Sequence, residues 1–379
     1  FCLSLLAPFY PIVAEIKGAT PSQYSLVFGV ASLTLFIFTP LVGIMIGRFG
    51  AVKISLCGLF LIGVTSILFG FLEKVNITSL FIGMSVLLRA FYGMGYAMVR
   101  NSGIAIVSHE FSENVEKSFA LVQSFSSAGQ LLGPVTGGAL YELGGFILPF
   151  TVTGAIVLFT AILVLFLSKE YPNRESKLSK KILMMLRHLQ VIIGVFAVFG
   201  FSTSIGIVIS FLEPHLKSLH LSPFQLGSMF FCNALASSSS SFFWSIMCEK
   251  FGRSEYIVPF SALIVICGLI LLGPAPYLPL DLSIYSTVSG LLIFGVGQGG
   301  LQVSAFSCIN KGVHSANISQ DIQSYGFIST IYTTSLALGL FVGPLIGGRL
   351  FDVIGFAWSC HIIIGYLLIG GTYFIEEIF

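Results

Sequence analysis

Residues 129–138 read GQLLGPVTGG, and residues 339–348 read GLFVGPLIGG. The second copy follows the first after 210 residues, and the similarity continues beyond each copy. The shared positions are Gly129, Gly133, Pro134, Gly137 and Gly138 in the first copy and Gly339, Gly343, Pro344, Gly347 and Gly348 in the second. Small residues four apart let helix backbones approach closely, and a proline bends a helix. The repeat predicts a duplicated helical fold, with these glycines as packing surfaces.

The composition around the two copies is that of a membrane protein. Of 379 residues, 55% are hydrophobic and 9% are charged, whereas a soluble domain has about 25% charged residues. A membrane-spanning helix needs about 20 apolar residues. The sequence predicts twelve spans, the first of them incomplete: residues 1–14, 23–47, 52–72, 79–106, 117–141, 146–168, 188–212, 223–247, 256–274, 283–309, 323–349 and 357–375. We therefore expect an all-α, polytopic membrane protein.

The longest polar stretch divides the spans into six and six. We expect an N-terminal six-helix bundle at 1–168, a cytoplasmic linker with a surface helix at 169–187, and a C-terminal six-helix bundle at 188–379. With the linker in the cytosol, four basic residues lie in the opposite loops and twelve lie in cytosolic loops: Arg48, Lys53, Lys117, Lys169, Arg174, Lys177, Lys180, Lys181, Arg187, Lys250, Arg253 and Lys311. This excess follows the positive-inside rule.

Two further motifs lie within or at the ends of predicted spans. The segment from Gly43 through Gly50 to Lys53 follows the second span, and a second copy follows the eighth span with Glu249, Gly252 and Arg253. Arg89 is followed by Gly93 and Gly95 in the fourth span. With the GxxxGPxxGG copies, these motifs resemble those of the major facilitator superfamily. The first copy departs from the family pattern, because Gly47 stands where the family has an aspartate.

Within that superfamily the chain resembles the vesicular amine and polyamine transporters, solute-carrier family eighteen, and the polyamine branch most. The residues that carry this resemblance are Pro8-Phe9-Tyr10-Pro11 with Glu15, Ser210-Phe211-Leu212-Glu213-Pro214 and Gly273-Pro274-Ala275-Pro276. The resemblance implies proton-coupled antiport of organic cations. Gln298 stands where monoamine transporters carry an acid, so their binding site does not transfer to this chain.

Ionisable residues inside a span are functional candidates because they are costly in lipid. Arg89 lies about ten residues into its span, and Arg100 lies eleven residues later on the same helix face, which also carries Tyr92 and Tyr96. Arg89 either acts on substrate or forms a structural pair. Glu213 and Glu15 lie at the lumenal ends of spans seven and one. They either bind a cation or proton, or face water.

Further candidates for cavity-lining or helix-bridging roles are Gln123, Asn233, Gln298, Gln302, Tyr325 and Tyr332. The histidines show no i, i+4 pairing, so no metal site or cofactor is predicted. His215 and His220 flank the lumenal end of the seventh span and are expected to lie in solvated loops, with sensing of acidity as the alternative. The sequence contains no stripe of basic residues that would indicate nucleic-acid binding. The GVGQGG run at 295–300 lies within a span and is interpreted as helix packing.

These features predict a monomeric secondary transporter that works by alternating access. We expect proton-coupled antiport of polyamines or amines into vesicles, in a vesicular or endolysosomal membrane rather than the plasma membrane. An organic-anion carrier with Arg89 as the clamp is the first alternative, because a positive charge repels a polycation. A non-transporting sensor on the same fold is the second. No protease motif or other catalytic constellation favours an enzyme.

Overall fold

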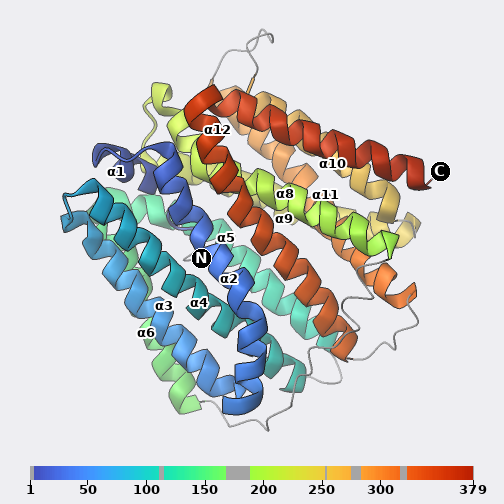
Figure 1. The fold of residues 1–379 in the computed structure, drawn as a ribbon, viewed down its shortest axis with the longest axis horizontal. Helices are drawn as coiled ribbons and strands as arrows, with labels where there is room; N and C mark the ends of the chain where they lie inside the picture. Colours follow the sequence, from blue (N-terminus) through green and yellow to red (C-terminus); the bar gives the residue numbers. More distant parts are fainter. Residues whose placement is uncertain are drawn as a thin grey trace. The chain divides into compact units, whose positions relative to one another are not determined.

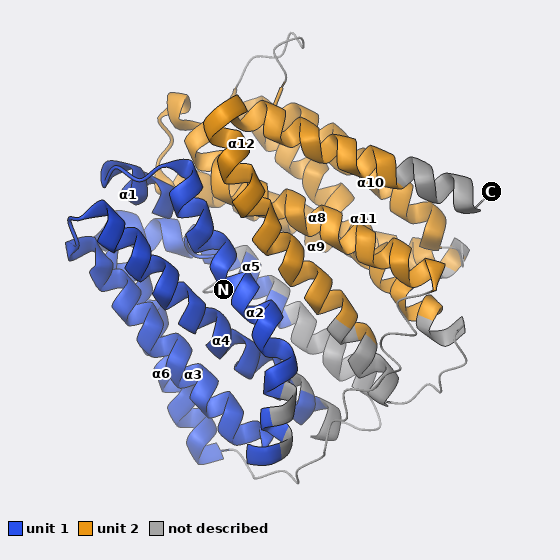
Figure 2. Cartoon of the chain, in the orientation of Figure 1, with its two compact units in different colours: residues 1–178 blue, residues 179–379 orange. Residues whose placement is uncertain are grey.

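The computed structural model describes residues 4–110, 115–167, 188–251, 254–274, 283–315 and 322–378. These residues form helices joined by short turns, with no β-strand among them (Figure 1). The chain divides into two compact units, residues 1–178 and 179–379 (Figure 2). The linker predicted at 169–187 lies outside the described residues, so the predicted domain boundaries remain a prediction.

Five long helices and one short helix make up the described part of unit 1. They are α1 (Tyr10–Ile16), α2 (Pro21–Phe49), α3 (Ala51–Gly70), α4 (Thr78–Glu110), α5 (Val115–Gly144) and α6 (Ile147–Leu167), with a 3₁₀ turn η1 (Phe71–Lys74) after α3. Regular helix in the first predicted span begins only at Tyr10, after a run of turns from residue 4. Pro11 lies in the first turn of α1, where a proline without a backbone donor is tolerated.

Unit 2 contains a series of helices similar to that of unit 1. They are α8 (Leu189–His215), α9 (Pro223–Phe251), α10 (Ser254–Leu272), α11 (Ile284–Ser315) and α12 (Ile322–Ile378), with a 3₁₀ turn η2 (Lys217–Leu219) after α8. α12 contains two helical segments, because Gly355 breaks it with a φ of 79°. This break falls between the predicted eleventh and twelfth spans.

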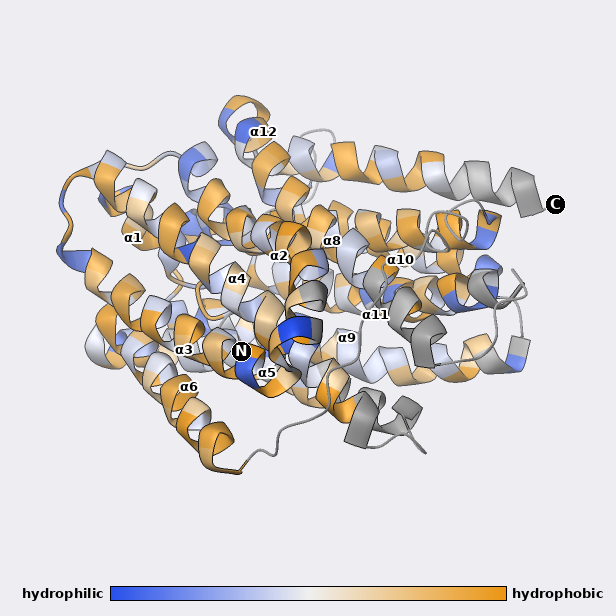
Figure 3. Ribbon diagram, turned by 60° about the horizontal axis from the view of Figure 1, so that its bottom comes forward, coloured by the Kyte–Doolittle hydropathy of each residue, from blue (hydrophilic) through white to orange (hydrophobic). Residues whose placement is uncertain are grey.

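The helices are strongly apolar. Among the described residues, eight segments are long and apolar enough to cross a membrane. Figure 3 shows hydrophobic residues along most of α3 and α6. The helices α1, α5 and α9 are not among the eight, and the eleventh and twelfth predicted spans count as one segment within α12. α1 is short, and α9 carries the serine run at 237–241.

Contacts between helices repeat in the two units. In unit 1 the Phe9 ring stacks on Tyr141 with centroids 4.9 Å apart. In unit 2 Phe211 stacks on Phe351 with centroids 5.3 Å apart. Phe211 lies 202 residues after Phe9, and Phe351 lies 210 residues after Tyr141. The second offset, 210, is also that of the GxxxGPxxGG copies. The duplication is therefore visible in packing as well as in sequence.

The glycines of the GxxxGPxxGG copies lie where helices meet. A Cβ atom on Gly343 of α12 would lie 2.5 Å from the Thr203 carbonyl oxygen of α8, and one on Gly347 would meet the Ile207 side chain at 2.7 Å. In unit 1 a Cβ on Gly137 would lie 2.8 Å from the Leu5 carbonyl oxygen. Since Leu5 and Ile207 are also 202 residues apart, both copies support the packing interpretation.

The serine run and the GVGQGG run meet between α9 and α11. The Ser240 hydroxyl and the Trp244 indole N–H both donate to the Val296 carbonyl oxygen, at 3.3 and 3.1 Å. A Cβ on Gly299 would lie 2.5 Å from the Ser237 carbonyl oxygen. The GVGQGG run is thus a surface for close helix packing, as the sequence predicted.

The corners that lead into α2 and α9 are also copies of each other. Thr20 and Ser222 precede a proline at the first helical position. Their backbone N–H groups donate to the side-chain oxygens of Gln23 and Gln225, at 3.0 and 2.9 Å. This reciprocal arrangement is a capping box, which satisfies donors that a helix start leaves open. Just before each corner the chain turns through a left-handed residue, Gly18 with φ 81° and His220 with φ 49°.

Replacing His220 by glycine should stabilise the protein. His220 is the one non-glycine residue with positive φ among the described residues, and its counterpart in the first repeat is Gly18. A left-handed conformation costs a side-chain-bearing residue about 1–2 kcal/mol, of which glycine's extra unfolded-state freedom offsets about half. We expect His220→Gly to raise the thermal unfolding midpoint in detergent and Gly18→Ala to lower it. A lower midpoint for His220→Gly would show that its side chain makes a contact worth more than this strain.

Candidate functional site

A ladder of charged and aromatic side chains runs along one face of α4. The Arg89 guanidinium carbon lies 5.0 Å from the centre of the Tyr92 ring. The Tyr92 and Tyr96 rings are stacked with centroids 6.4 Å apart. The Arg100 Nη1 atom donates to the Tyr96 hydroxyl at 3.2 Å. Steps of three and four residues place these side chains above one another on a helix, so the structure brings together the four residues that the sequence assigned to one face.

Arg89 is buried, with 4% of its surface exposed. Its Nε atom lies 3.4 Å from the Val27 carbonyl oxygen of α2, which accepts its hydrogen. One helical turn further along, Gly93 lets α4 approach α2 so closely that a Cβ there would overlap the Ala31 carbonyl oxygen. A buried charge must be compensated by polar groups, and the carbonyl oxygen and the Tyr92 ring face contribute to that compensation.

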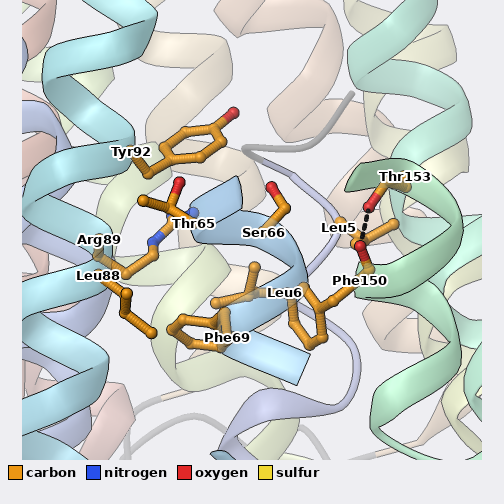
Figure 4. Close-up of a pocket in the computed structure, with 10 residues that line it drawn as sticks. All are labelled: Leu5, Leu6, Thr65, Ser66, Phe69, Leu88, Arg89, Tyr92, Phe150 and Thr153. Carbon is orange, nitrogen blue, oxygen red and sulfur yellow. Dashed lines mark hydrogen bonds between the residues drawn. The ribbon is translucent and has the colours of Figure 1, made fainter. Parts of the chain in front are cut away.

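A small cavity adjoins Arg89 inside unit 1 (Figure 4). It is lined by Leu5, Leu6, Thr65, Ser66, Phe69, Leu88, Arg89, Tyr92, Phe150 and Thr153. Its volume is about 10 Å³, which is room for a single water molecule. The Thr65 and Thr153 hydroxyls donate to carbonyl oxygens of their own helices, both at 2.7 Å. They therefore present oxygen lone pairs to the cavity, an arrangement that suits water better than an anion.

Glu213 is the buried acid of unit 2. It lies near the end of α8 with 6% of its surface exposed, and Pro214 follows it. A carboxylate taken out of water is costly unless it is protonated or satisfied by polar groups. Such a residue in a membrane-spanning helix is a functional candidate. The structure places Glu213 in the protein interior, not at a solvated helix end.

His215 differs from the sequence expectation of a solvated loop residue. It belongs to the last turn of α8, and its ring stacks on Phe356 with centroids 4.5 Å apart. Phe356 directly follows the break at Gly355, so this contact joins segments more than a hundred residues apart in sequence. Tertiary packing of this kind leaves no local signal in the sequence, which explains the wrong prediction.

Glu15 is less enclosed than Glu213. It is half-buried at the end of α1, beside a cluster that the sequence did not predict. The Lys17 ammonium group donates to the Glu73 and Val75 carbonyl oxygens, at 2.8 and 2.6 Å, and lies 5.1 Å from the centre of the Phe81 ring. Lys17 thereby fixes the end of α1 to the connection between α3 and α4. In the sequence, the positive charge of Lys17 was the one feature that pointed to this role.

The amide and tyrosine candidates divide into two groups. The Asn233 Nδ2 atom donates to the Leu291 carbonyl oxygen at 3.1 Å and so bridges α9 and α11. Gln298 and Gln302 are half-buried on α11, and the Tyr332 ring meets Phe306 edge-on with centroids 5.8 Å apart. The side chains of Gln123, Tyr325 and Glu249, and residues Gly252 and Arg253, lie outside the described part of the structure.

The remaining motif glycines are backbone features. Gly50 separates α2 from α3 with a φ of 88°, which favours glycine. Gly43 lies within α2, and Gly129, Gly133 and Gly138 lie within α5. The described part of the chain contains no group of three or more His, Cys, Asp or Glu side chains that could hold a metal ion. Arg89 and Glu213 are thus the two charged side chains that the structure shows as buried within the described residues.

Comparison with known protein families matches residues 1–325 to the Major Facilitator Superfamily. The MFS-type transporter SLC18B1 of Homo sapiens is 29% identical over 376 residues, which cover 98% of this chain and 81% of that protein. The vesicular acetylcholine transporter of Homo sapiens is 25% identical over 363 residues, covering 93% of this chain and 64% of that protein. These similarities confirm the resemblance to solute-carrier family eighteen.

Solved structures agree on the fold. A bacterial homolog of the human lysosomal transporter Spinster superposes with a TM-score of 0.78 at 14% identity, covering 99% of this chain and 92% of that one. A mutant of the nucleoside transporter NupG gives a TM-score of 0.75 at 11% identity, covering 99% of this chain and 96% of that one. At these identities the likeness concerns the fold alone.

Proposed function

This chain belongs to the Major Facilitator Superfamily and is a multi-pass integral membrane protein, and from that premise we propose that it is a proton-coupled antiporter of organic cations such as polyamines or amines. The family is one of transporters and not of enzymes. The observation that carries the proposal is Glu213, a buried carboxylate in a chain related to a vesicular transporter of a cation.

The proposed architecture has twelve spans in two six-helix bundles. The helices of each unit, the break at Gly355 and the repeated aromatic stacks support six spans per half. Duplicated bundles that move about a central site are a common design of secondary transporters. The excess of basic residues in one set of loops supports placing both termini in the cytosol.

Glu213 suits both partners of an antiport cycle. An ionised carboxylate attracts an ammonium group strongly where little water screens the charges. In the proposed cycle the same carboxyl group carries a proton when no cation is bound. A single acid that accepts either a proton or a cation would couple their movements in opposite directions. Glu15, which is half-buried, is the second candidate for a cation contact.

The organic-anion alternative rests on Arg89, a buried cation that lines a cavity. That cavity is about 10 Å³, so it has no room for an organic anion in this conformation, and the Thr65 and Thr153 hydroxyls present lone pairs to it. The Arg89 contacts to Val27 and Tyr92 support a structural or positioning role instead. A vesicular or endolysosomal membrane is the proposed location, since the related acetylcholine transporter is vesicular by name.

Uptake into proteoliposomes tests the substrate class. With an acidic interior, we expect labelled spermidine to accumulate about tenfold for each proton exchanged across one pH unit, because 1.4 kcal/mol corresponds to a factor of ten. A labelled dicarboxylate should show no such accumulation. Accumulation of the dicarboxylate alone would instead support the anion carrier, and saturable spermidine binding without any counterflow would support the sensor.

A further inference from the structure

A groove runs between α9 and α10 on the surface of unit 2. Both helices pack along α11 but scarcely touch each other, so α11 forms the floor and the other two form the walls. The groove has a volume of about 440 Å³ and is lined by Leu235, Ala236, Ser239, Ile264, Leu292, Ile293 and Val296. Its volume lies within the range of small-molecule sites, about 300–1,000 Å³.

The lining chemistry is almost entirely aliphatic. Ser239 is the one hydroxyl in the lining, and it donates to the Leu235 carbonyl oxygen of its own helix at 2.7 Å. No lining side chain is charged or offers a free donor that would orient a polar ligand. An apolar and flexible occupant therefore fits this groove.

The groove opens onto an exposed apolar surface of unit 2. Its rim includes Leu235 and Leu292, which are 50% and 42% exposed, and its neighbours on α10 are the exposed Phe260 and Leu263. The lining residues lie in the middle parts of α9, α10 and α11, away from the helix ends. In a membrane-spanning bundle this is the depth of acyl chains, where water and headgroups are absent.

The first repeat carries larger side chains at four of the six corresponding positions on α9 and α11. Gly93 approaches Ala31 as Gly295 approaches Asn233, which fixes an offset of 202 residues for the α9 wall and the α11 floor. At that offset Ser239, Ile293 and Val296 correspond to Ile37, Phe91 and Met94, and Ala236 corresponds to Thr34. Leu292 is the exception, since it corresponds to the smaller Ala90. Most of the groove lining on α9 and α11 thus consists of side chains that are smaller than their counterparts in the first repeat.

We propose that one acyl chain of a bilayer phospholipid occupies this groove, wedged between α9 and α10 against α11. The chain would contact the aliphatic lining that the smaller residues of the second repeat leave uncovered. This inference is independent of the transported substrate. It is separate from the ladder on α4 and from Glu213.

Trp244 lies next to the groove and can report on its occupant. It is only 4% exposed, it donates to the carbonyl oxygen of the groove residue Val296, and its cluster packs against Ile264. The one other tryptophan, Trp358, can be changed to phenylalanine. In vesicles of phospholipid brominated at mid-chain, we expect strong quenching of Trp244 fluorescence, since bromine quenches at contact. Filling the groove with the first-repeat residues, Ser239→Ile with Val296→Met, should reduce that quenching about twofold, because contact range is only about 4 Å.

Thr160→Ile, a similar change on the exposed part of α6, is the matched control and should leave the quenching of Trp244 unchanged. Should the double variant fail to fold, Val296→Met alone gives the same comparison. Weak quenching by mid-chain bromine in the Trp358→Phe protein, or quenching unaffected by the filling variants, would overturn the proposal. Cross-linking of two copies through position 239 would also overturn it, in favour of a dimer contact.

Discussion

Glu213→Gln should reduce proton-driven spermidine uptake by about 100-fold, the low end of what a proton-transferring residue contributes. The amide has nearly the same shape as the carboxylate but neither ionises nor carries a proton. Since Glu213 is buried in α8, water cannot replace the missing charge. Initial rates of labelled spermidine uptake into acid-loaded proteoliposomes measure this effect.

Two comparisons separate coupling from general damage. Glu73→Gln changes an exposed acid in η1 and should retain uptake. Exchange of external labelled spermidine for internal unlabelled spermidine, without a pH gradient, should persist in Glu213→Gln if the residue carries only the proton. It should be lost if Glu213 also binds the cation. Full pH-driven uptake by Glu213→Gln would contradict the role assigned to this residue.

Gly343→Ala should destabilise unit 2 severely. The added methyl group would lie 2.5 Å from the Thr203 carbonyl oxygen, a backbone atom that cannot rotate away. Forcing atoms into a packed contact costs about 1–3 kcal/mol and often more. We expect a lower thermal unfolding midpoint and less monodisperse protein on size-exclusion chromatography.

Gly365→Ala is the matched control, because Gly365 lies in the second helical segment of α12 with open space where a Cβ would be placed. This change should be neutral, or stabilising by up to about 1 kcal/mol, as alanine is the better helix former. Equal stability of the two variants would mean that the close contact between α8 and α12 does not hold unit 2 together.

Much of the fold followed from patterns that are local in sequence. Apolar runs of span length and the GxxxGPxxGG repeat predicted helices and a duplicated packing surface, because both depend on spacing alone. The matching corners at Thr20 and Ser222 also had a sequence signal, a capping residue before proline with a glutamine three residues after the capping residue, but it was missed. It is short and its flanking residues differ between the two copies.

The site was predictable only in part. Helical periodicity placed Arg89, Tyr92, Tyr96 and Arg100 on one face, and the structure shows them in contact. The burial of Glu213 and the stacking of His215 on Phe356 depend on long-range packing of α8 with α12, which spacing within one helix cannot reveal.

Proton movement driven by substrate tests the central claim most directly. Proteoliposomes loaded with a pH-sensitive dye and held at an acidic interior should become less acidic when spermidine is added outside. This response should require the protein and should be lost in Glu213→Gln. Spermidine entry with no change in internal pH, or an internal pH that responds equally in Glu213→Gln, would contradict proton-coupled antiport through this acid.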